Sequence, residues 1–427
     1  MEIKFKVNAT VLNNALSVVS IVPPIAATPQ GGSGYLFVVS GKTCKVYTKD
    51  RTQLARTSFE IEDVEGEGPF MYPSQFIDTF KFIKGDIQFT ASEQDGVFRV
   101  KYLAEGGYKD DRVSFDPRSM EIFDKKIEVA EQTIRPRQFN IPILREALSV
   151  SKVFLPDSET EKTVDDHFKV VQIFGSEDPQ AHPSLVKANG YMFVSNSVGA
   201  FYFYCDAFQN NDLIVPGDHL GAFEQFLSKS KGKLLEVYPT EDKTYVKNSD
   251  GQVFGWSKHK SQYTKFAYYG TKQERVVLNL DRDTVTLRLQ YIRAALAKGR
   301  DKIRLHYEAK ADQIYFSIAD ENSDTVSPSM EARAKETDGK DFTAYCNVNQ
   351  MLHLFRGTKV ANVGFRVLII DSDDQHPKPR YMFRTIDEFL IDDNGKVADV
   401  VDTKEGQPVV PDGAYLCRLT RFAPGKD

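Results

Sequence analysis

The stretch Cys346–Ile370, CNVNQMLHLFRGTKVANVGFRVLII, decides the fold class that this sequence predicts. Four apolar residues recur at the i, i+3, i+4 and i+7 spacing of one helix face, namely Val348, Met351, Leu352 and Phe355. A basic residue and Gly357 follow this helix, and GFRVLII then indicates a strand. An acidic turn and a second strand, RYMF, complete a unit of helix, strand, turn and strand.

The same unit occurs twice more upstream. Residues 71–102 begin with MYPSQFIDTFKFIKG, whose apolar stripe is Phe76, Ile77, Phe80 and Ile83. Residues 215–248 begin with VPGDHLGAFEQFLSKSKG and continue into two short strands around an acidic turn. The interval from Pro73 to Pro216 is similar to the interval from Pro216 to Val348. Similar units at regular spacing indicate a repeat architecture.

A second kind of unit precedes each of these, with a strand that runs into a helix and then alternating strands. Its helices are expected within Phe5–Val22, Phe139–Phe154 and Leu280–Gly299. The sequence therefore predicts an α+β protein of three repeated domains, each with two helices and two small antiparallel sheets. A generic α+β repeat protein is the alternative. The expected domains are residues 1–135, 136–272 and 273–427.

Composition places the chain among soluble globular proteins of a reducing compartment. It is 41% hydrophobic and 27% charged, without a biased tract. The opening MEIKFKV alternates like a strand, no signal-peptide core follows, and no apolar run is long enough to span a membrane. Four cysteines are scattered singly, which argues against a disulfide framework or a zinc site. We expect a cytoplasmic protein without a membrane partner.

Catalytic motifs are not found in the sequence. Gly41, Lys42 and Thr43 spell GKT, but Leu36 stands where a P-loop needs its first glycine, and CKVYTKD after it predicts a strand. The acidic run Asp371–His376 could suggest a metal cluster, yet it falls where each repeat has its acidic hairpin turn. The sequence predicts no enzyme and no cofactor.

Four segments carry a resemblance to a known family: MEIKFKV at the start, VPGDHL, FTAYCNVNQMLHLF, and AYLCRLTRF near the end. Together they resemble the bacterial β sliding clamp, the processivity subunit of the replicative DNA polymerase. The resemblance spans essentially the whole chain. Departures from the family pattern suit a divergent bacteriophage version, which we take as a hypothesis that would place the protein in the host-cell cytoplasm.

The resemblance implies DNA-clamp domains whose two copies pair head to tail into a homodimeric ring. Its helices would line a hole for duplex DNA, which they would hold without reading its sequence. The implied partners are double-stranded DNA, a DNA polymerase, a clamp loader and a second copy of the chain.

A sliding protein needs lysines and arginines near phosphates rather than contacts to base edges. Net charge is −5, so such residues must gather on one surface. The first expected helix, residues 8–22, has no lysine or arginine, which departs from the family. The candidate DNA-binding residues are Lys81, Lys84, Arg145, Lys152, Lys229, Lys231, Arg288, Arg293, Lys298, Arg356 and Lys359, with Arg300 and Lys302 near them in sequence.

The family binds short peptides of its partners in an apolar pocket between the second and third domains. Apolar side chains at most of the matching positions would still accept a hydrophobic anchor. Alternatively, Met192, Phe193 and Leu416 are simply core residues. The positions carried over by resemblance are Val170, Ala188, Gly190, Tyr191, Met192, Phe193, Asn347, Leu416, Cys417, Arg418, Leu419 and Thr420, with Asn189 and Arg421 flanking them.

Two rival interpretations stay open. A non-ring interaction scaffold of repeated α+β domains would show no concentration of positive charge on its helix layer. A nuclease or other nucleic-acid enzyme would bring carboxylates together in a cleft, and the acids in this sequence are dispersed.

Overall fold

The computed structural model falls into two compact units, each described by itself. The first unit comprises Met1–Ile141 with His219–Lys258, and the second comprises Pro142–Asp218 with His259–Asp427. The structure describes residues 2–24, 34–94, 97–104, 107–114, 126–156, 168–176, 190–195, 199–259, 276–297, 300–319, 325–337, 341–356, 361–370, 380–388, 390–391, 397–398 and 414–422.

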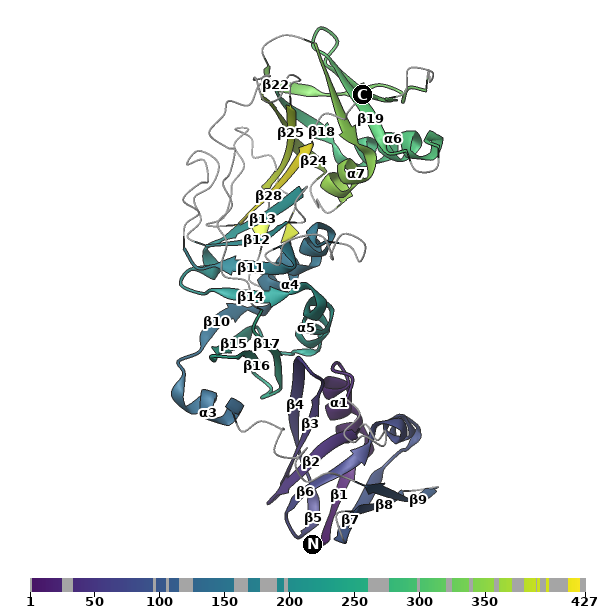
Figure 1. Ribbon diagram of the computed structural model, residues 1–427, viewed down its shortest axis with the longest axis vertical. Coiled ribbons are helices and arrows are strands. Elements are labelled where there is room, and N and C mark those ends of the chain that lie inside the picture. The colour runs from purple at the N-terminus through teal and green to yellow at the C-terminus, as the bar shows by residue number, and fades with distance from the viewer. Residues whose placement is uncertain are drawn as a thin grey trace. The chain divides into compact units, whose positions relative to one another are not determined.

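The first unit contains two antiparallel sheets (Figure 1). The five-stranded sheet has the order β5 (Glu62–Glu65), β1 (Glu2–Asn8), β7 (Asp86–Gln94), β8 (Val97–Ala104) and β9 (Gly107–Ser114). The eight-stranded sheet has the order β10 (Arg137–Asn140), β15 (Leu234–Pro239), β16 (Lys243–Asn248), β17 (Val253–Ser257), β4 (Gln53–Glu60), β3 (Thr43–Lys49), β2 (Gly34–Ser40) and β6 (Gly68–Pro73).

Helices cover these sheets with their apolar faces. The α-helix α1 (Ala9–Val19) packs on β3 and β4 with Leu12, Leu16 and Val19 buried. Its first turn is capped by the Asn8 side chain, whose oxygen accepts from the Thr10 amide at 3.0 Å. The other helical segments of this unit are η1 (Ser74–Phe82), a 3₁₀ helix, α3 (Lys126–Thr133), and most of α5 (Gly217–Lys229).

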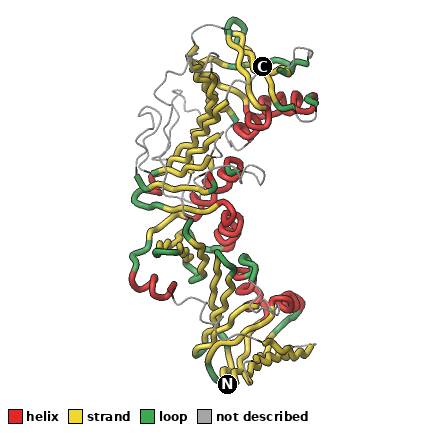
Figure 2. Tube along the Cα trace, in the orientation of Figure 1, coloured by secondary structure: helices red, strands yellow, loops and turns green. Residues whose placement is uncertain are grey.

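The second unit contains a larger sheet and two smaller ones. Figure 2 draws the strands in yellow. The nine-stranded sheet has the order β14 (Leu213–Pro216), β11 (Val170–Phe174), β12 (Tyr191–Ser195), β13 (Gly199–Cys205), β28 (Ala414–Phe422), β25 (Arg380–Glu388), β24 (Asn362–Ile370), β18 (Val276–Asp281) and β22 (Arg333–Thr337). The smaller sheets are β21 (Met330–Glu331), β20 (Gln313–Ile318), β19 (Lys302–Glu308) and β23 (Phe342–Asn347), and the pair β26 (Leu390–Ile391) and β27 (Val397–Ala398).

The helical segments of the second unit include three α-helices and two short 3₁₀ turns. In α7 the predicted stripe is confirmed, because Val348, Met351, Leu352 and Phe355 are all buried. No helix of the described residues is long and apolar enough to cross a membrane. The segments are α4 (Ile141–Ser151), η2 (Lys152–Phe154), η4 (Asp206–Phe208), α6 (Arg282–Ala295) and α7 (Val348–Arg356).

One plan recurs three times along the chain. The four-strand orders β6-β2-β3-β4, β14-β11-β12-β13 and β23-β19-β20-β21 are equivalent, as are β1-β7-β8-β9, β10-β15-β16-β17 and β18-β24-β25-β28. A helix follows the first-named strand of each set: η1, α5, α7, α1, α4 and α6. The α+β class and the repeated antiparallel sheets predicted from the sequence are confirmed. The domain boundaries stay predictions, and that at residues 272 and 273 lies outside the described residues.

The sequence predicted two separate small sheets in each domain, but in the structure some of these sheets are joined. The edge strand β4 pairs with β17, and the edge strand β13 pairs with β28, so sets from neighbouring repeats form continuous sheets. Joining two edges satisfies backbone N–H and C=O groups that each edge would leave open. The edge strands β9 and β21, which hold the equivalent positions, have no such neighbour among the described strands.

The helix α3 was not expected, because the sequence predicted two helices per domain. It buries Ile127 and Ala130 against Leu54, Tyr245 and Val253 of the eight-stranded sheet. Those residues belong to β4, β16 and β17, so α3 covers the place where the two strand sets join. The segment KIEVAEQT carries too few apolar residues to predict a packed helix from periodicity.

The GKT segment forms a turn and a strand, as predicted. Gly41 adopts a positive φ of 54° in the turn between β2 and β3, and Thr43 begins β3. The acidic run Asp371–His376 lies outside the described residues.

Candidate nucleic-acid interface and partner strand

The predicted DNA-binding residues of the first repeat lie at the end of η1. The ammonium group of Lys81 is exposed and 2.6 Å from the Asp78 carboxylate. The spacing of three residues between Lys81 and Lys84 predicts that one helix face carries both, but η1 ends at Phe82 and Lys84 lies between η1 and β7. Ile83 adopts an extended backbone conformation, with φ −89° and ψ 137°, which ends the helix before Lys84. Both lysines remain exposed.

Lys229 has a partner within the protein. It is half-buried at the end of α5, and its Nζ donates a hydrogen bond to the backbone carbonyl of Ser17. Ser17 lies in the last turn of α1, where carbonyls lack intrahelical partners and where α1 has no basic residue of its own. Burial lowers the pKa of Lys229. The role of Lys229 in DNA binding stays a prediction, while the structure shows it linking α5 to α1.

Lys231 follows α5 and is exposed. Its backbone N–H donates to the Asp250 carboxylate at 3.2 Å, which fixes the backbone at this position.

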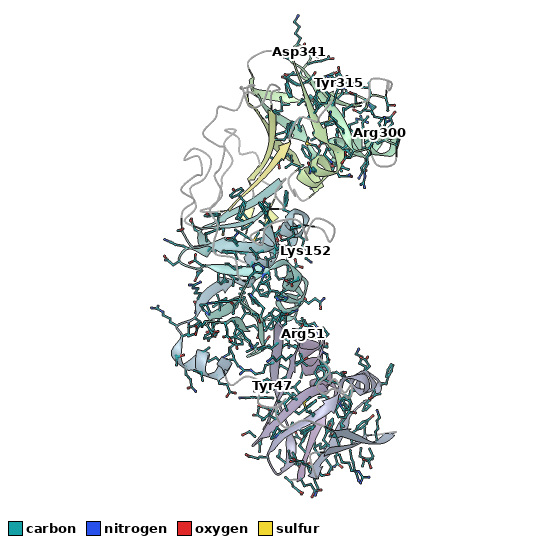
Figure 3. All side chains as sticks on the ribbon, in the orientation of Figure 1. Tyr47, Arg51, Lys152, Arg300, Tyr315 and Asp341 are labelled. Atoms are coloured by element: carbon teal, nitrogen blue, oxygen red, sulfur yellow. The ribbon has the colours of Figure 1, made fainter. Side chains whose placement is uncertain are left out.

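In the second unit the predicted residues are distributed over three helices. Arg145 is exposed on α4, and Lys152 is exposed where α4 passes into η2 (Figure 3). On α6, Arg293 is exposed in the last turn and Arg288 is partly buried. Arg356 ends α7, but its side chain lies outside the described part, as do Lys298 and Lys359 altogether.

These basic side chains have properties suited to phosphates. Lys84, Arg145, Lys231 and Arg293 are exposed on helices or directly after them. Long flexible cations held by helices can contact phosphates loosely, through water or directly, without reading base edges.

The predicted partner residues fall mainly on the nine-stranded sheet. Val170 lies on β11 and Tyr191–Phe193 on β12, while the segment 416–420 forms the middle of β28. The strand β13 lies between β12 and β28, and its Phe203 pairs in register with Met192 on one side and Leu416 on the other. The fold thus brings segments far apart in sequence within two strands of each other.

The side chains of these residues are buried where they are described. Val170 and Met192 are fully buried, and Phe193 is 3% exposed. This burial supports the alternative that Met192 and Phe193 are core residues. Gly190 is required by packing, because a Cβ there would lie 2.8 Å from the Cβ of Phe208. Ala188 and the side chains of 416–420 lie outside the described part.

Asn347 has a local structural role. It ends β23 on the four-stranded sheet, and its side-chain oxygen accepts from the amides of Asn349 and Gln350 at 2.9 and 3.1 Å. Its amide group donates to Asp301. Asn347 therefore caps the N-terminus of α7.

Similarity to known proteins is found at the level of structure. No protein-family model and no curated protein matches the chain by sequence. The β sliding clamp of C. crescentus matches with a TM-score of 0.70, 13% identity and 99% of both chains covered. The DNA polymerase sliding clamp of Bacillus subtilis matches with 0.69, 11% and 100% of both chains.

The chain has the sliding-clamp fold. The β clamp of Helicobacter pylori extends the comparison, with a TM-score of 0.69 and 14% identity over 99% of this chain and 100% of that one. The likeness therefore covers all three repeats of the sliding-clamp fold and not a single shared module.

Three exposed apolar side chains of this sliding-clamp fold were missed by the sequence analysis. Phe82 is 87% exposed at the end of η1, and Leu287 and Tyr291 are 58% and 52% exposed one turn apart on α6. All three lie outside the buried face of their helix. On α6 that face is formed by Val285, Leu289 and Ile292. An apolar residue off the stripe was the signal available in the sequence.

Proposed function

We propose that this protein is a DNA sliding clamp, in which two copies join head to tail into a ring around duplex DNA and tether a polymerase as a processivity factor. The observation that carries the proposal is the pair of edge strands β9 and β21, which have no joining partner among the described strands and stand at the two ends of a series of equivalent joins. The fold, shared with clamps over the whole chain, supports the same conclusion.

The joins within the chain follow one rule. Two joins are seen, β4 with β17 and β13 with β28, and each pairs the last-named strand of one set with the last-named strand of the other kind of set in the next repeat. A third join of this kind pairs β21 with β9. A second copy can supply it at both ends, since a head-to-tail contact repeated twice closes a ring.

The helices support the same closure. At the β4–β17 join the first helix of one repeat, α1, meets the second helix of the next, α5, through Ser17 and Lys229. The equivalent contact at ring closure brings α6 of one copy to η1 of the other. These two segments carry the exposed Leu287, Tyr291 and Phe82, which would be buried there.

The DNA contact in this proposal is electrostatic and independent of sequence. The lysines and arginines on and next to the helices would neutralise phosphates. The proposed DNA-binding set is Lys81, Lys84, Arg145, Lys152, Lys231, Arg293 and the partly buried Arg288, together with Lys298, Arg356 and Lys359 from sequence. Lys229 would contribute chiefly by fixing α5 to α1.

The remaining partners follow from the same role. A DNA polymerase would dock a short peptide near β28 and the segment 188–193, and a clamp loader would open the ring. The protein would act as a non-enzymatic homodimer in the cytoplasm, of the host cell if its origin is a bacteriophage. The three domains would be residues 1–135, 136–272 and 273–427.

The comparison of circular with linear DNA gives the decisive test. Light scattering measures the oligomeric mass, and retention on a nicked circular plasmid is compared before and after linearisation, with and without a loader. We expect a dimer that stays on circles and leaves through linear ends. A monomer with no difference between circular and linear DNA in either condition would support the scaffold interpretation instead.

A further inference from the structure

The strand β4 is paired along only half of one side. On the other side it pairs with β3 from Lys49 to Thr43. Towards β17 it pairs only at Gln53–Arg56, and no described strand continues beyond that point. The second join, between β13 and β28, runs over the full length of β13. The first join therefore leaves the segment Thr57–Glu60 as an open edge.

Backbone groups of two residues point to this open side. The Ser257 amide donates to the Thr52 carbonyl at 2.7 Å, so even-numbered residues of this segment face β17. The Ile61 amide donates to the Lys42 carbonyl at 2.9 Å, so odd-numbered residues face β3. Because hydrogen-bonding directions alternate along a strand, the N–H and C=O groups of Ser58 and Glu60 face the side where β17 has ended.

A tight turn fixes where β17 begins. The buried Asn248 side chain accepts from the Gln252 amide at 3.0 Å and donates to the Gln252 side chain at 2.8 Å. Gly251 adopts a positive φ of 74° in the turn. The turn directs the chain away directly before Val253, so β17 itself does not extend along the open half of β4.

A groove of about 730 Å³ adjoins the open edge. The segment Thr57–Glu62 forms one wall and α1 forms another, with Val11, Asn14 and Ala15 lining it. Val11 is 40% exposed on this wall, although it is apolar. Thr57 and Phe59 are buried on the face of β4 that α1 covers, whereas Ser58 and Glu60 are exposed on the opposite face.

The charges of the groove are unequal. Lys6 is paired with Asp86 at 2.9 Å. The other charged lining residues are Lys42, Glu60 and Glu62, which leaves an excess of negative charge close to the open edge. A basic side chain on an occupant would complement it.

We propose that the open half of β4 is a docking site for an extended segment of a partner protein, which adds as a strand antiparallel to β4. This mode of recognition uses main-chain hydrogen bonds for affinity and alternate side chains for specificity. Read from its N-terminus, the segment places a lysine or arginine opposite Glu60, an apolar residue opposite Phe59, any residue opposite Ser58, and an apolar residue opposite Thr57. The two apolar residues face Val11 and Ala15 of α1.

This site belongs to the first unit, whereas the segments proposed for the polymerase belong to the second. The site requires neither ring closure nor DNA, so its test is independent of the proposed clamp function.

The test uses the full chain and a fluorescent hexapeptide, Gly-Lys-Val-Thr-Val-Gly with blocked ends, in an anisotropy titration. Ser58→Pro removes the N–H on the open side, and a proline is tolerated at a strand edge. Ser58→Ala is the matched control, because it keeps the N–H. Val11→Asp makes the helix wall polar at an exposed position in the first turns of α1, where an acid is compatible with the helix.

We expect saturable binding that weakens about tenfold or more with Ser58→Pro and with Val11→Asp and is unchanged with Ser58→Ala. The peptide with glutamate in place of lysine should bind more weakly to the unsubstituted protein. Circular dichroism and thermal unfolding establish that the variants stay folded. Absence of saturable binding to the unsubstituted protein, or equal binding to Ser58→Pro and Ser58→Ala, would overturn the proposal.

Discussion

The guanidinium group of Arg56 on β4 lies 3.0 Å from the carboxylate of Glu131 on α3. The Arg56 side chain is 8% exposed, so this ion pair is largely buried. Lys247 on β16 lies 3.2 Å from the same Glu131 carboxylate. Ion pairs therefore hold the helix α3 to strands on both sides of the β4–β17 join, in addition to the apolar contacts of Ile127.

Removing Glu131 should destabilise the first unit strongly. Glu131→Ala leaves the Arg56 charge buried without its nearest carboxylate, and loss of one partner of a buried pair costs about 3 kcal/mol. Glu65→Ala is the matched control, because Glu65 is 72% exposed and pairs with the partly exposed Lys4 at 3.0 Å, and such pairs contribute about 1 kcal/mol or less. Denaturant unfolding measures both. Equal losses in the two variants would show that Arg56 does not depend on Glu131.

Ring closure should depend on the exposed face of α6. The double variant Leu287→Asp with Tyr291→Asp should be monomeric by light scattering at a concentration where the unsubstituted protein is a dimer, because closure would bury two carboxylates without partners. Leu234→Asp changes a similarly exposed leucine on β15 and serves as the control. A dimer that persists in the double variant would place the closing contact elsewhere.

The exposed lysine and arginine side chains should set the salt dependence of DNA binding. For the double variant Lys84→Glu with Arg145→Glu, binding to a short linear duplex should weaken, and the slope of log affinity against log salt should fall by about 0.9 for each lost phosphate contact. The control double variant Lys42→Glu with Lys310→Glu makes the same charge change in the turns between β2 and β3 and between β19 and β20. If this control changes the slope as much as the first double variant does, the effect comes from net charge and not from the helix layer.

His306 should make stability sensitive to mild acid. Burial is the main cause that lowers the pKa of His306, with the nearby Arg304 charge as a second cause. Its Nδ1 lies 2.9 Å from the Thr343 hydroxyl. Since the unfolded chain takes up the proton at an ordinary pKa of about 6.5 and the folded protein only at lower pH, stability falls as pH drops below that value.

The measurement is the unfolding free energy of the protein and of His306→Gln between pH 7.5 and about 5. The variant should lose less stability across this range, while the two should differ little in their pH dependence above it. Parallel curves throughout the acidic range would show that His306 does not contribute to the acid sensitivity.

Local periodicity in the sequence was sufficient to predict the elements and their repetition. The stripe Val348, Met351, Leu352 and Phe355 faces the core as predicted, because side-chain spacing alone decides which face of a helix is apolar. The strand after Gly41 and the cap at Asn8 follow from equally local chemistry. The same reasoning failed at η1, which ends at Phe82 and so includes Lys81 but not Lys84. It also failed at α3, whose short segment has little periodicity.

The sequence by itself determined the α+β class, the threefold repetition and the types of residues on each helix. Tertiary structure alone decided that β4 pairs with β17, that Lys229 reaches Ser17, and that Arg56 meets Glu131. Each of these contacts joins residues far apart in the chain, and strand pairing is made by backbone groups that are chemically the same at nearly every position. Their choice of partner therefore depends on the edges and faces that remain open after the local elements have packed.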